Sequence, residues 1–308
     1  MIIKYSIIIP TYNRPDYLEL CCKAISDQMW KENDVEVIVV DDGSEERCAC
    51  RNREITGKHG FTYIYQQNRG MASARNTGID RCNGEWIIFL DDDVLIADNW
   101  FDRITDSLSG LSESVVGAEG KVEGSGDGLW DREVQNLQGG AFLTCHLAVR
   151  KEILIELSGF DTAFKKNLPY CEDHELAARL LKKGKVVFLS DVKVTHLPRK
   201  VKLIRYILQA PKRIRSLLKA DLYFYTRHPD QYRFFRHADT FWGTCLSVLF
   251  KNVYKTFKRR DLRRITANPL QSIALLVASL IEQLCAWVVI AELLLIYRKS
   301  KTGKKDRV

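Results

Sequence analysis

The chain has 308 residues, 46% of them hydrophobic, which is enough to bury one large domain and an appendage. Its net charge of +8 is unevenly spread, because residues 1–191 carry 22 Lys and Arg against 32 Asp and Glu, whereas residues 192–308 carry 25 against 7. Nine cysteines without paired zinc-ligand spacing, and no apolar leader ahead of the first strand, argue against a secreted disulfide framework and predict a cytoplasmic protein.

Apolar runs alternate with amphipathic stretches through the first 90 residues. The predicted strands are residues 6–10, 35–40, 61–65 and 86–90. Helices are predicted from Pro15 and over residues 70–79. Because the strands are apolar and alternate with helices, they predict a doubly wound α/β sheet with parallel strands.

The middle of the chain is harder to interpret. Seven glycines between residues 117 and 140 predict a flexible loop. The other elements expected in this part are strands at 141–149, 186–189 and 192–196 and helices at 151–157 and 172–183. Gly184 is expected to end the last of these helices, since glycine readily takes the left-handed cap conformation.

The last third of the chain has a different character. The segment 192–220 contains no acidic residue, and residues 269–297 are overwhelmingly apolar, with Glu282 and Glu292 as their charged residues. A basic and apolar region of this kind predicts contact with an anionic surface such as lipid headgroups. For residues 269–297 we favour a helix lying in the membrane interface; a spanning helix and a core or oligomer-forming helix stay open.

Three consecutive carboxylates, Asp91, Asp92 and Asp93, follow the apolar strand at residues 86–90. Like charges this close raise one another's pKa unless a cation neutralises them, and oxygen ligands on a short loop suit Mg²⁺ or Mn²⁺ carrying a substrate phosphate. Ligands of doubly wound sheets bind at the carboxyl ends of the strands, where these aspartates fall. The alternative is an acidic, solvated turn.

Two more features lie at predicted strand and helix ends. Asp42 follows the strand at residues 35–40 and is well placed to accept a hydrogen bond from a uracil or thymine imide, although a plain turn is the alternative. The amino end of the helix at residues 70–79 offers free amides to a diphosphate. Arg75 would add a charged contact to that group, or else form a structural salt bridge to the aspartates.

Several motifs in order resemble glycosyltransferase family 2, whose members are inverting enzymes of GT-A fold. The motifs are Ile8–Arg14, Val39–Ser44, Asn68–Gly70 with Ala74–Asn76, and Leu90–Asp93. Gly159–Asp161, Glu172 with Asp173, and His196 extend the resemblance to about residue 200. The resemblance implies a GT-A-type doubly wound mixed sheet over residues 1–200, a catalytic domain, followed by a helical, membrane-associated region at 201–308.

The resemblance also implies roles for individual residues. Thr11 and Asp42 would line the base pocket, Asp91 would contact the ribose, and Asp92 would turn away or support its neighbours. The metal ligands would be Asp93 and His196, although a lone histidine at a strand end is often structural. Asp173 would be the base that takes the acceptor's proton. Glu172 would assist it, or only complement the dipole of the helix that it begins.

Together these observations predict an inverting glycosyltransferase that depends on Mn²⁺ or Mg²⁺. Its donor is expected to be a UDP-sugar, with dTDP- and GDP-sugars as alternatives, and Trp130 could stack on a sugar ring. The acceptor is expected to be a glycan or a lipid-linked glycan in polysaccharide synthesis, at the inner face of the cell membrane.

Two other classes of protein stay open. One is a non-catalytic membrane- or nucleic-acid-associated protein that uses the same fold, but the basic region carries no RNA-binding fingerprint, so no nucleic-acid partner is expected. The other is a nucleotidyltransferase, which would need a glycine-rich basic loop after the first strand, and Pro10–Asn13 is not such a loop.

Overall fold

The structure is a computed structural model of the chain. The residues that it describes are 3–29, 34–125, 134–164, 171–198, 203–236, 240, 241, 243, 245, 280, 281 and 283–292. The chain divides into two compact units, Met1–Arg199 and Lys200–Val308. Trp130 and most of the apolar stretch 269–297 lie outside the described residues.

The first unit is built on an eight-stranded mixed sheet with the order β3-β2-β1-β4-β7-β6-β8-β5. The strands are β1 Tyr5–Thr11, β2 Val35–Asp41, β3 Thr62–Tyr65, β4 Trp86–Leu90, β5 Val94–Ile96, β6 Val115–Gly124, β7 His146–Arg150 and β8 Lys185–His196. The first four strands in this order are parallel. In the other half, β7 is antiparallel to β4 and β6, β8 is parallel to β6, and β5 is antiparallel to β8.

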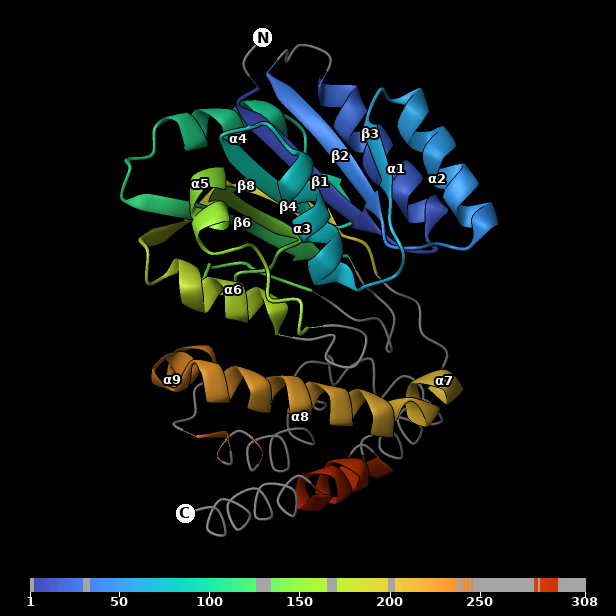
Figure 1. The fold of residues 1–308 in the computed structure, drawn as a ribbon, viewed down its shortest axis with the longest axis vertical. Helices are drawn as coiled ribbons and strands as arrows, with labels where there is room; N and C mark the ends of the chain where they lie inside the picture. The colour runs from blue at the N-terminus through green and yellow to red at the C-terminus, as the bar shows by residue number, and fades with distance from the viewer. Residues whose placement is uncertain are drawn as a thin grey trace, which may run out of the picture. The chain divides into compact units, whose positions relative to one another are not determined.

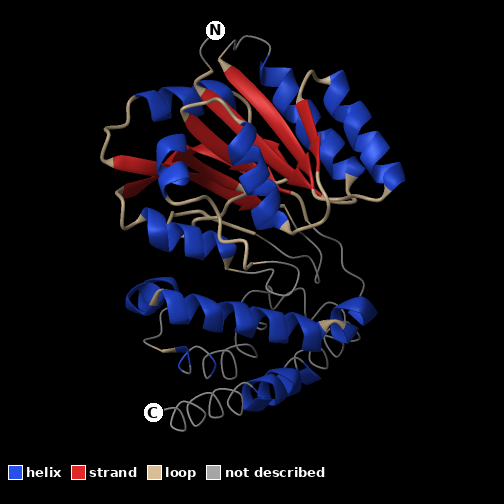
Figure 2. Cartoon of the chain, viewed as in Figure 1, coloured by secondary structure: helices blue, strands red, loops and turns tan. Residues whose placement is uncertain are grey.

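Helices cover both faces of this sheet (Figures 1 and 2). They are α1 Pro15–Met29, α2 Glu46–Lys58, α3 Met71–Arg81, α4 Trp100–Ser109, α5 Lys151–Glu156 and α6 Glu172–Leu180. Apolar residues of α1, α2 and α4 form one buried cluster with the sheet, and those of α3, α5 and α6 form the other. The result is the three-layer α/β architecture expected of a doubly wound sheet.

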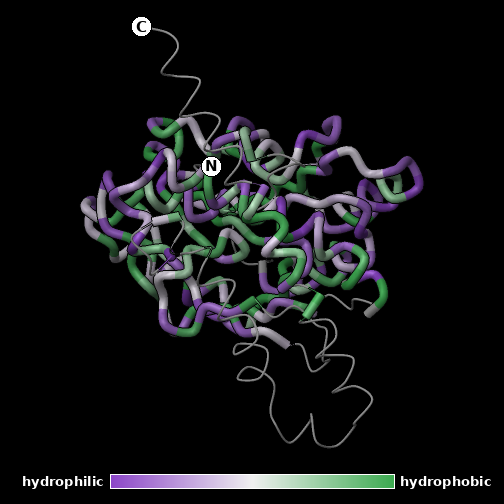
Figure 3. The backbone as a smooth tube through the Cα atoms, turned by 90° about the horizontal axis from the view of Figure 1, so that it is seen from below, coloured by the Kyte–Doolittle hydropathy of each residue, from purple (hydrophilic) through white to green (hydrophobic). Residues whose placement is uncertain are grey.

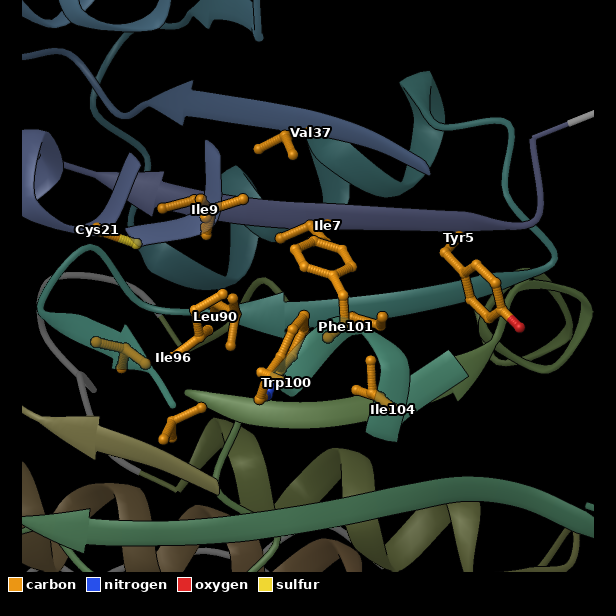
Figure 4. Close-up of a cluster of buried hydrophobic side chains, with 14 of the residues drawn as sticks. Tyr5, Ile7, Ile9, Cys21, Val37, Leu90, Ile96, Trp100, Phe101 and Ile104 are labelled. Carbon is orange, nitrogen blue, oxygen red and sulfur yellow. The ribbon is translucent and has the colours of Figure 1, made fainter. Parts of the chain in front are cut away.

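The two clusters share the strands because successive side chains of a strand point to opposite faces. In β1, Ile7 and Ile9 join the first cluster and Ile8 joins the second, all fully buried. Figure 4 shows the first cluster, in which Trp100, Phe101 and Ile104 of α4 lie among the strand side chains. Figure 3 shows how hydrophobic and hydrophilic stretches alternate along the backbone.

The register of the parallel strands brings their carboxyl ends to one edge of the sheet. Thr11 at the end of β1 pairs with Asp41 at the end of β2, and Ile8 of β1 pairs with Phe89 of β4. The loops that follow these strands therefore carry the aspartates onto a common edge, as the sequence predicts.

Two expectations about the middle of the chain were wrong. Gly117, Gly120 and Gly124 belong to strand β6 and not to a loop, because β6 packs so closely on β7 that a Cβ at Gly120 would lie 1.9 Å from the His146 ring. The strands expected at 186–189 and 192–196 are one strand, β8, with a register shift against β6 between Gly120 and Lys121.

Other elements were missed or misplaced. Residues 141–145 precede β7 and are not part of a strand, and α2, α4 and β5 had no prediction. The missed helix α4 is amphipathic, with Trp100, Phe101, Ile104 and Leu108 buried. Helix α6 ends at Leu180, three residues before the predicted end, and Gly184 does not take the left-handed conformation expected of a cap. The remaining predicted elements agree with the structure to within a few residues at their ends.

The second unit contains the helices α7 Leu203–Leu208, α8 Ala210–Arg227 and α9 Pro229–Arg236, and residues 283–292 are also helical. A buried carboxylate, Asp221 of α8, accepts hydrogen bonds from the Tyr232 hydroxyl and the Arg236 guanidinium of α9. Among the described residues, no helix is both long and apolar enough to cross a bilayer.

Candidate active site

Asp91, Asp93 and His196 come together at the edge of the sheet. Asp91 follows β4 directly, Asp93 precedes β5, and the pairing of Val94 with His196 brings the end of β8 alongside. One ligand atom from each of the three lies within 4.8 Å of the other two. His196 reaches the two aspartates only because β5 pairs with β8, and this pairing had not been predicted.

The chemistry of this group fits a divalent cation. The His196 Nδ1 lies 3.0 Å from the Leu197 carbonyl oxygen, and since a carbonyl only accepts, Nδ1 carries the proton. When the ring is neutral, its lone pair is then on Nε2, which lies 3.4 Å from the Asp93 Oδ1. Two carboxylates and one imidazole are a suitable ligand set for Mn²⁺, and the second-nitrogen hydrogen bond is typical of metal-ligating histidines.

Arg14 neutralises the other side of the aspartate cluster. Its guanidinium donates to Asp92 and to the Oδ2 of Asp93, the latter at 2.9 and 3.0 Å. Asp92 also accepts from the Thr11 hydroxyl at 2.8 Å, so it faces β1 and not the group of Asp91, Asp93 and His196. Burial raises the pKa of Asp92 to about 6, and the Arg14 charge opposes that rise.

Arg75 of α3 lies between the aspartates and a second acidic pair. It is 1% exposed, and its Nη2 donates to the Asp91 Oδ1 at 2.8 Å. Its Nη1 lies 3.8 Å from a Glu172 carboxylate oxygen and 4.0 Å from one of Asp173. Neither Nη1 nor Nε has a hydrogen-bond partner among the described residues, although the guanidinium lies over the Phe160 ring. The structure thus contains the predicted salt bridge, and two buried donors remain free for a ligand.

Glu172 and Asp173 occupy the first turn of α6, where their charge complements the helix dipole. Burial raises the pKa of both carboxyl groups, and their mutual repulsion adds to the rise for Glu172. Asp173 accepts a hydrogen bond of 2.7 Å from the Thr144 hydroxyl, which opposes the rise. A carboxyl group with a raised affinity for protons is what general-base catalysis needs.

Asp42 follows β2, and hydrogen bonds from within the protein occupy most of the acceptor sites of its carboxylate. Its Oδ1 accepts from the Gln66 side chain at 2.6 Å and from the Arg69 amide at 2.9 Å, and its Oδ2 accepts from the Gly70 amide at 2.8 Å. A carboxylate has about four acceptor sites, so about one remains for a base. Asp41 is fully buried and accepts one backbone and two side-chain hydrogen bonds, which makes it structural.

A family model described as "Glycosyl transferase family 2" matches residues 6–165, more than half of the chain. The chain belongs to glycosyltransferase family 2. Its curated relatives include the glycosyltransferase AglE of Haloferax volcanii, 33% identical over 124 residues, which are 38% of this chain and 39% of AglE. They also include the GalNAc(5)-diNAcBac-PP-undecaprenol beta-1,3-glucosyltransferase of Campylobacter jejuni, 37% identical over 94 residues, which are 29% of each protein.

Solved structures share the GT-A-like fold of this glycosyltransferase. TarS 1–349 of S. aureus in complex with UDP-GlcNAc superposes with a TM-score of 0.57 at 16% identity, covering 97% of this chain and 92% of TarS 1–349. The mannosyltransferase PcManGT of Pyrobaculum calidifontis, in complex with GDP-Man and Mn²⁺, superposes with a TM-score of 0.54 at 17% identity, covering 91% and 87%. At these identities the likeness concerns the fold alone.

Sequence reasoning missed several residues of the glycosyltransferase site. Arg14 belongs to the first family motif but had no role, although a basic residue beside a cluster of aspartates is a natural counter-charge. Gln66 and Thr144 carry no signal in the sequence, because their contacts with Asp42 and Asp173 depend on how distant loops pack. Trp130 lies outside the described residues, so its stacking stays a prediction.

Proposed function

We propose that this family 2 glycosyltransferase is a metal-dependent inverting enzyme that transfers a sugar from a nucleotide sugar to a hydroxyl group of a glycan or lipid-linked acceptor. The observation that carries the proposal is the position of Arg75. It contacts Asp91 of the candidate metal group on one side and approaches the Glu172–Asp173 pair on the other. The guanidinium of Arg75 therefore lies between the candidate donor site and the candidate base.

The proposed reaction is a single displacement. The acceptor oxygen attacks the anomeric carbon of the sugar, and the bond from that carbon to the diphosphate oxygen breaks, with its electron pair leaving on the nucleotide diphosphate. Asp173 takes the proton of the acceptor hydroxyl as the new bond forms. Attack from the face opposite the leaving group inverts the configuration of the anomeric carbon.

The leaving diphosphate needs positive charge and hydrogen-bond donors. Asp91, Asp93 and His196 would hold a divalent cation, which supplies charge stabilisation for the diphosphate when bound. The unpaired Nη1 and Nε of Arg75 would donate to the donor or to groups ordered by it. The amides at the amino end of α3 favour an anion nearby. Arg14 holds Asp92 and Asp93 in place before any cation arrives.

The nucleotide is proposed to bind at the ends of β1 and β2. Asp42 keeps about one acceptor site for a base imide, and Thr11 lies at the end of the neighbouring strand. We propose a UDP-sugar as the donor, with dTDP- and GDP-sugars as alternatives. Complexes of fold neighbours with UDP-GlcNAc and with GDP-Man and Mn²⁺ support donors of this class.

The acceptor is proposed to be a growing glycan, free or linked to a lipid, at the inner face of a membrane. The basic composition of residues 192–308 supports this, because cationic residues near a surface favour anionic lipids. The name of the Campylobacter jejuni relative, which specifies an undecaprenol-linked glycan, points to acceptors of the same chemistry.

The test is nucleotide-sugar turnover by the full-length chain. Purified protein is incubated with UDP-, GDP- and dTDP-sugars, with Mn²⁺, Mg²⁺ or a chelator, and donor hydrolysis is followed by chromatography. The proposal predicts slow hydrolysis of one donor class that needs the cation. Absence of binding and turnover for every nucleotide sugar, with cation present, would contradict it.

A further inference from the structure

A turn at residues 136–144 leads into β7. It is fixed by Glu119 of β6, whose buried carboxylate accepts hydrogen bonds from the Asn136 side chain at 2.9 Å, the Gly140 amide at 2.7 Å and the Phe142 amide at 2.6 Å. The backbone of Asn136 also pairs with Val122 of β6 in both directions. A buried acid with three donors from one turn is an anchor for that turn.

The turn carries local strain that the anchor stabilises. Phe142 has φ of +50°, a left-handed conformation that non-glycine residues seldom adopt, and its side chain is 3% exposed. Such residues persist only where the surrounding structure holds them, and they gather at functional sites. The Glu119 carboxylate, which accepts a hydrogen bond from the Phe142 amide, is one contact that holds it here.

Thr144, two residues after Phe142 in the same turn, contacts the candidate base Asp173. The Thr144 hydroxyl donates to the Asp173 Oδ1 at 2.7 Å, and the Thr144 amide points to the Oδ2 at 3.4 Å. Both oxygens of the carboxylate are therefore oriented by one residue, 29 positions away in the sequence. Thr144 is 1% exposed, so water does not compete for its hydroxyl.

We propose that Thr144 is a positioning residue that orients the Asp173 carboxylate toward the acceptor hydroxyl, and that Glu119 acts through the turn to hold Thr144 in place. This inference rests on the proposed role of Asp173 as general base. Neither residue would touch the substrate. Their contribution is geometric, since a base displaced by about 1 Å loses about a hundredfold in rate.

The charges around Asp173 set the direction of the pH effect. Arg75 approaches it from α3 at 4.0 Å, Glu172 precedes it on α6, Asp91 follows β4, and Cys145, a buried thiol with a raised pKa, follows Thr144. Arg75 and the Thr144 hydroxyl favour the carboxylate, whereas burial and Asp91 favour the protonated acid. Removing the Thr144 hydroxyl would therefore raise the pKa of Asp173 further.

The test compares Thr144→Val with Thr144→Ser in the full-length chain, using hydrolysis of the nucleotide sugar that wild type turns over. For Thr144→Val we expect kcat to fall roughly tenfold to a hundredfold, with KM for the donor unchanged and the acid limb of kcat/KM moved to higher pH. Thr144→Ser keeps the hydroxyl and should restore most of the rate. Thr62→Val, on the exposed start of β3, is the matched control and should behave as wild type.

Two results would overturn the inference. One is a Thr144→Val variant with the wild-type kcat and acid limb. The other is equal impairment of the Val and Ser variants together with loss of donor binding, which would mean that Thr144 serves only the fold.

A second variant tests the anchor, and a second readout separates the two proposals. Glu119→Gln should lower kcat in the same manner, with UDP binding unchanged; weakened UDP binding with unchanged kcat would contradict the role of Glu119.

Titration of the Asp173 carboxyl by carbon-13 NMR needs no substrate, and its pKa should rise in Thr144→Val. Failure of wild type to bind any nucleotide sugar would remove the proposed function, whereas an unmoved Asp173 titration in Thr144→Val would remove this inference.

Discussion

The two halves of the sheet treat their carboxylates differently. At the ends of the parallel strands, Asp42 accepts three hydrogen bonds and Asp92 and Asp93 share the Arg14 guanidinium. Beside the mixed half, the Glu172–Asp173 pair has a raised pKa. Several donors orient the acids at the ends of the parallel strands, and the Arg14 charge opposes the rise that burial causes in the pKa of Asp92. The pair on α6 holds its protons more tightly than ordinary carboxyl groups do, which suits proton transfer. We propose that the acids at the ends of the parallel strands bind the donor, joined there by His196 from the end of β8, and that α6 beside the mixed half supplies the base.

The largest effect is expected from the metal group. Asp93→Asn removes one anionic ligand, and cation-dependent donor turnover should fall by at least about a thousandfold, because a bound cation supplies several kcal/mol of charge stabilisation. Turnover is measured against Mn²⁺ concentration, with Glu113→Gln, an exposed acid, as the matched control. Activity that stayed near wild type without added cation would contradict a metal role for this half.

A smaller loss of activity is expected from removal of the candidate base. Asp173→Asn cannot accept a proton, and transfer should fall by about 10²- to 10⁴-fold. Binding of UDP with Mn²⁺ should stay near wild type, since the carboxylate does not belong to the metal group. The measurement is kcat alongside the dissociation constant of UDP. A variant that loses UDP binding as well would place Asp173 in the donor half.

The mixed half should also respond to steric change where β6 meets β7. Gly120→Ala would place a Cβ 1.9 Å from the His146 ring, which is fixed by the Trp100 indole and the Lys121 carbonyl. We expect the free energy of unfolding to fall by about 2–3 kcal/mol. Urea unfolding measures it.

The matched control for that substitution is Gly57→Ala in helix α2. A Cβ there meets nothing within 4 Å, and its φ is not positive. Because alanine loses less entropy in a helix, this change should raise the free energy of unfolding by about 0.5–1 kcal/mol. Equal effects of the two substitutions would show that the close β6–β7 approach is not a constraint.

The smallest effect concerns pH. Burial and the Asp173 charge raise the pKa of Glu172 to about 8, so Glu172 is still uncharged while Asp173 loses its proton. Glu172→Gln therefore replaces one uncharged group by another, and the acid limb of kcat/KM, which reports the deprotonation of the base, should stay where it is in wild type. A shift of that limb to lower pH would mean that Glu172 is charged while Asp173 titrates.

The strands of the parallel half could be predicted from the sequence, whereas those of the mixed half could be predicted only in part. The strands of the parallel half are apolar runs bounded by helices, so their period and order predicted β1 to β4 and the edge that carries the aspartates. In the mixed half, β6 contains three glycines and β8 is half exposed, so their strand character comes from pairing partners.

The site follows the same rule. The run Asp91–Asp93 was predicted as a carboxylate cluster suited to a cation, and the family resemblance gave Asp93 and His196 as metal ligands and Asp91 as a ribose contact. That Asp91 lies with Asp93 and His196 in one group is a finding of the structure. Arg14, Gln66 and Thr144 were not, because each acts on an acid that lies at least 24 residues away and meets it only when the loops are packed. The sequence pattern shows where along the chain the acidic residues lie. Which side chains hydrogen-bond to them depends on the tertiary packing of the loops.

The most direct test of this division is calorimetric titration of UDP into Asp93→Asn and Asp173→Asn, each with Mn²⁺ and with chelator. The account predicts that Asp173→Asn binds UDP in the presence of Mn²⁺ as wild type does, and that Asp93→Asn shows no difference between Mn²⁺ and chelator. Loss of Mn²⁺-dependent binding in Asp173→Asn, or its survival in Asp93→Asn, would contradict the assignment of donor binding to one half and of the base to the other.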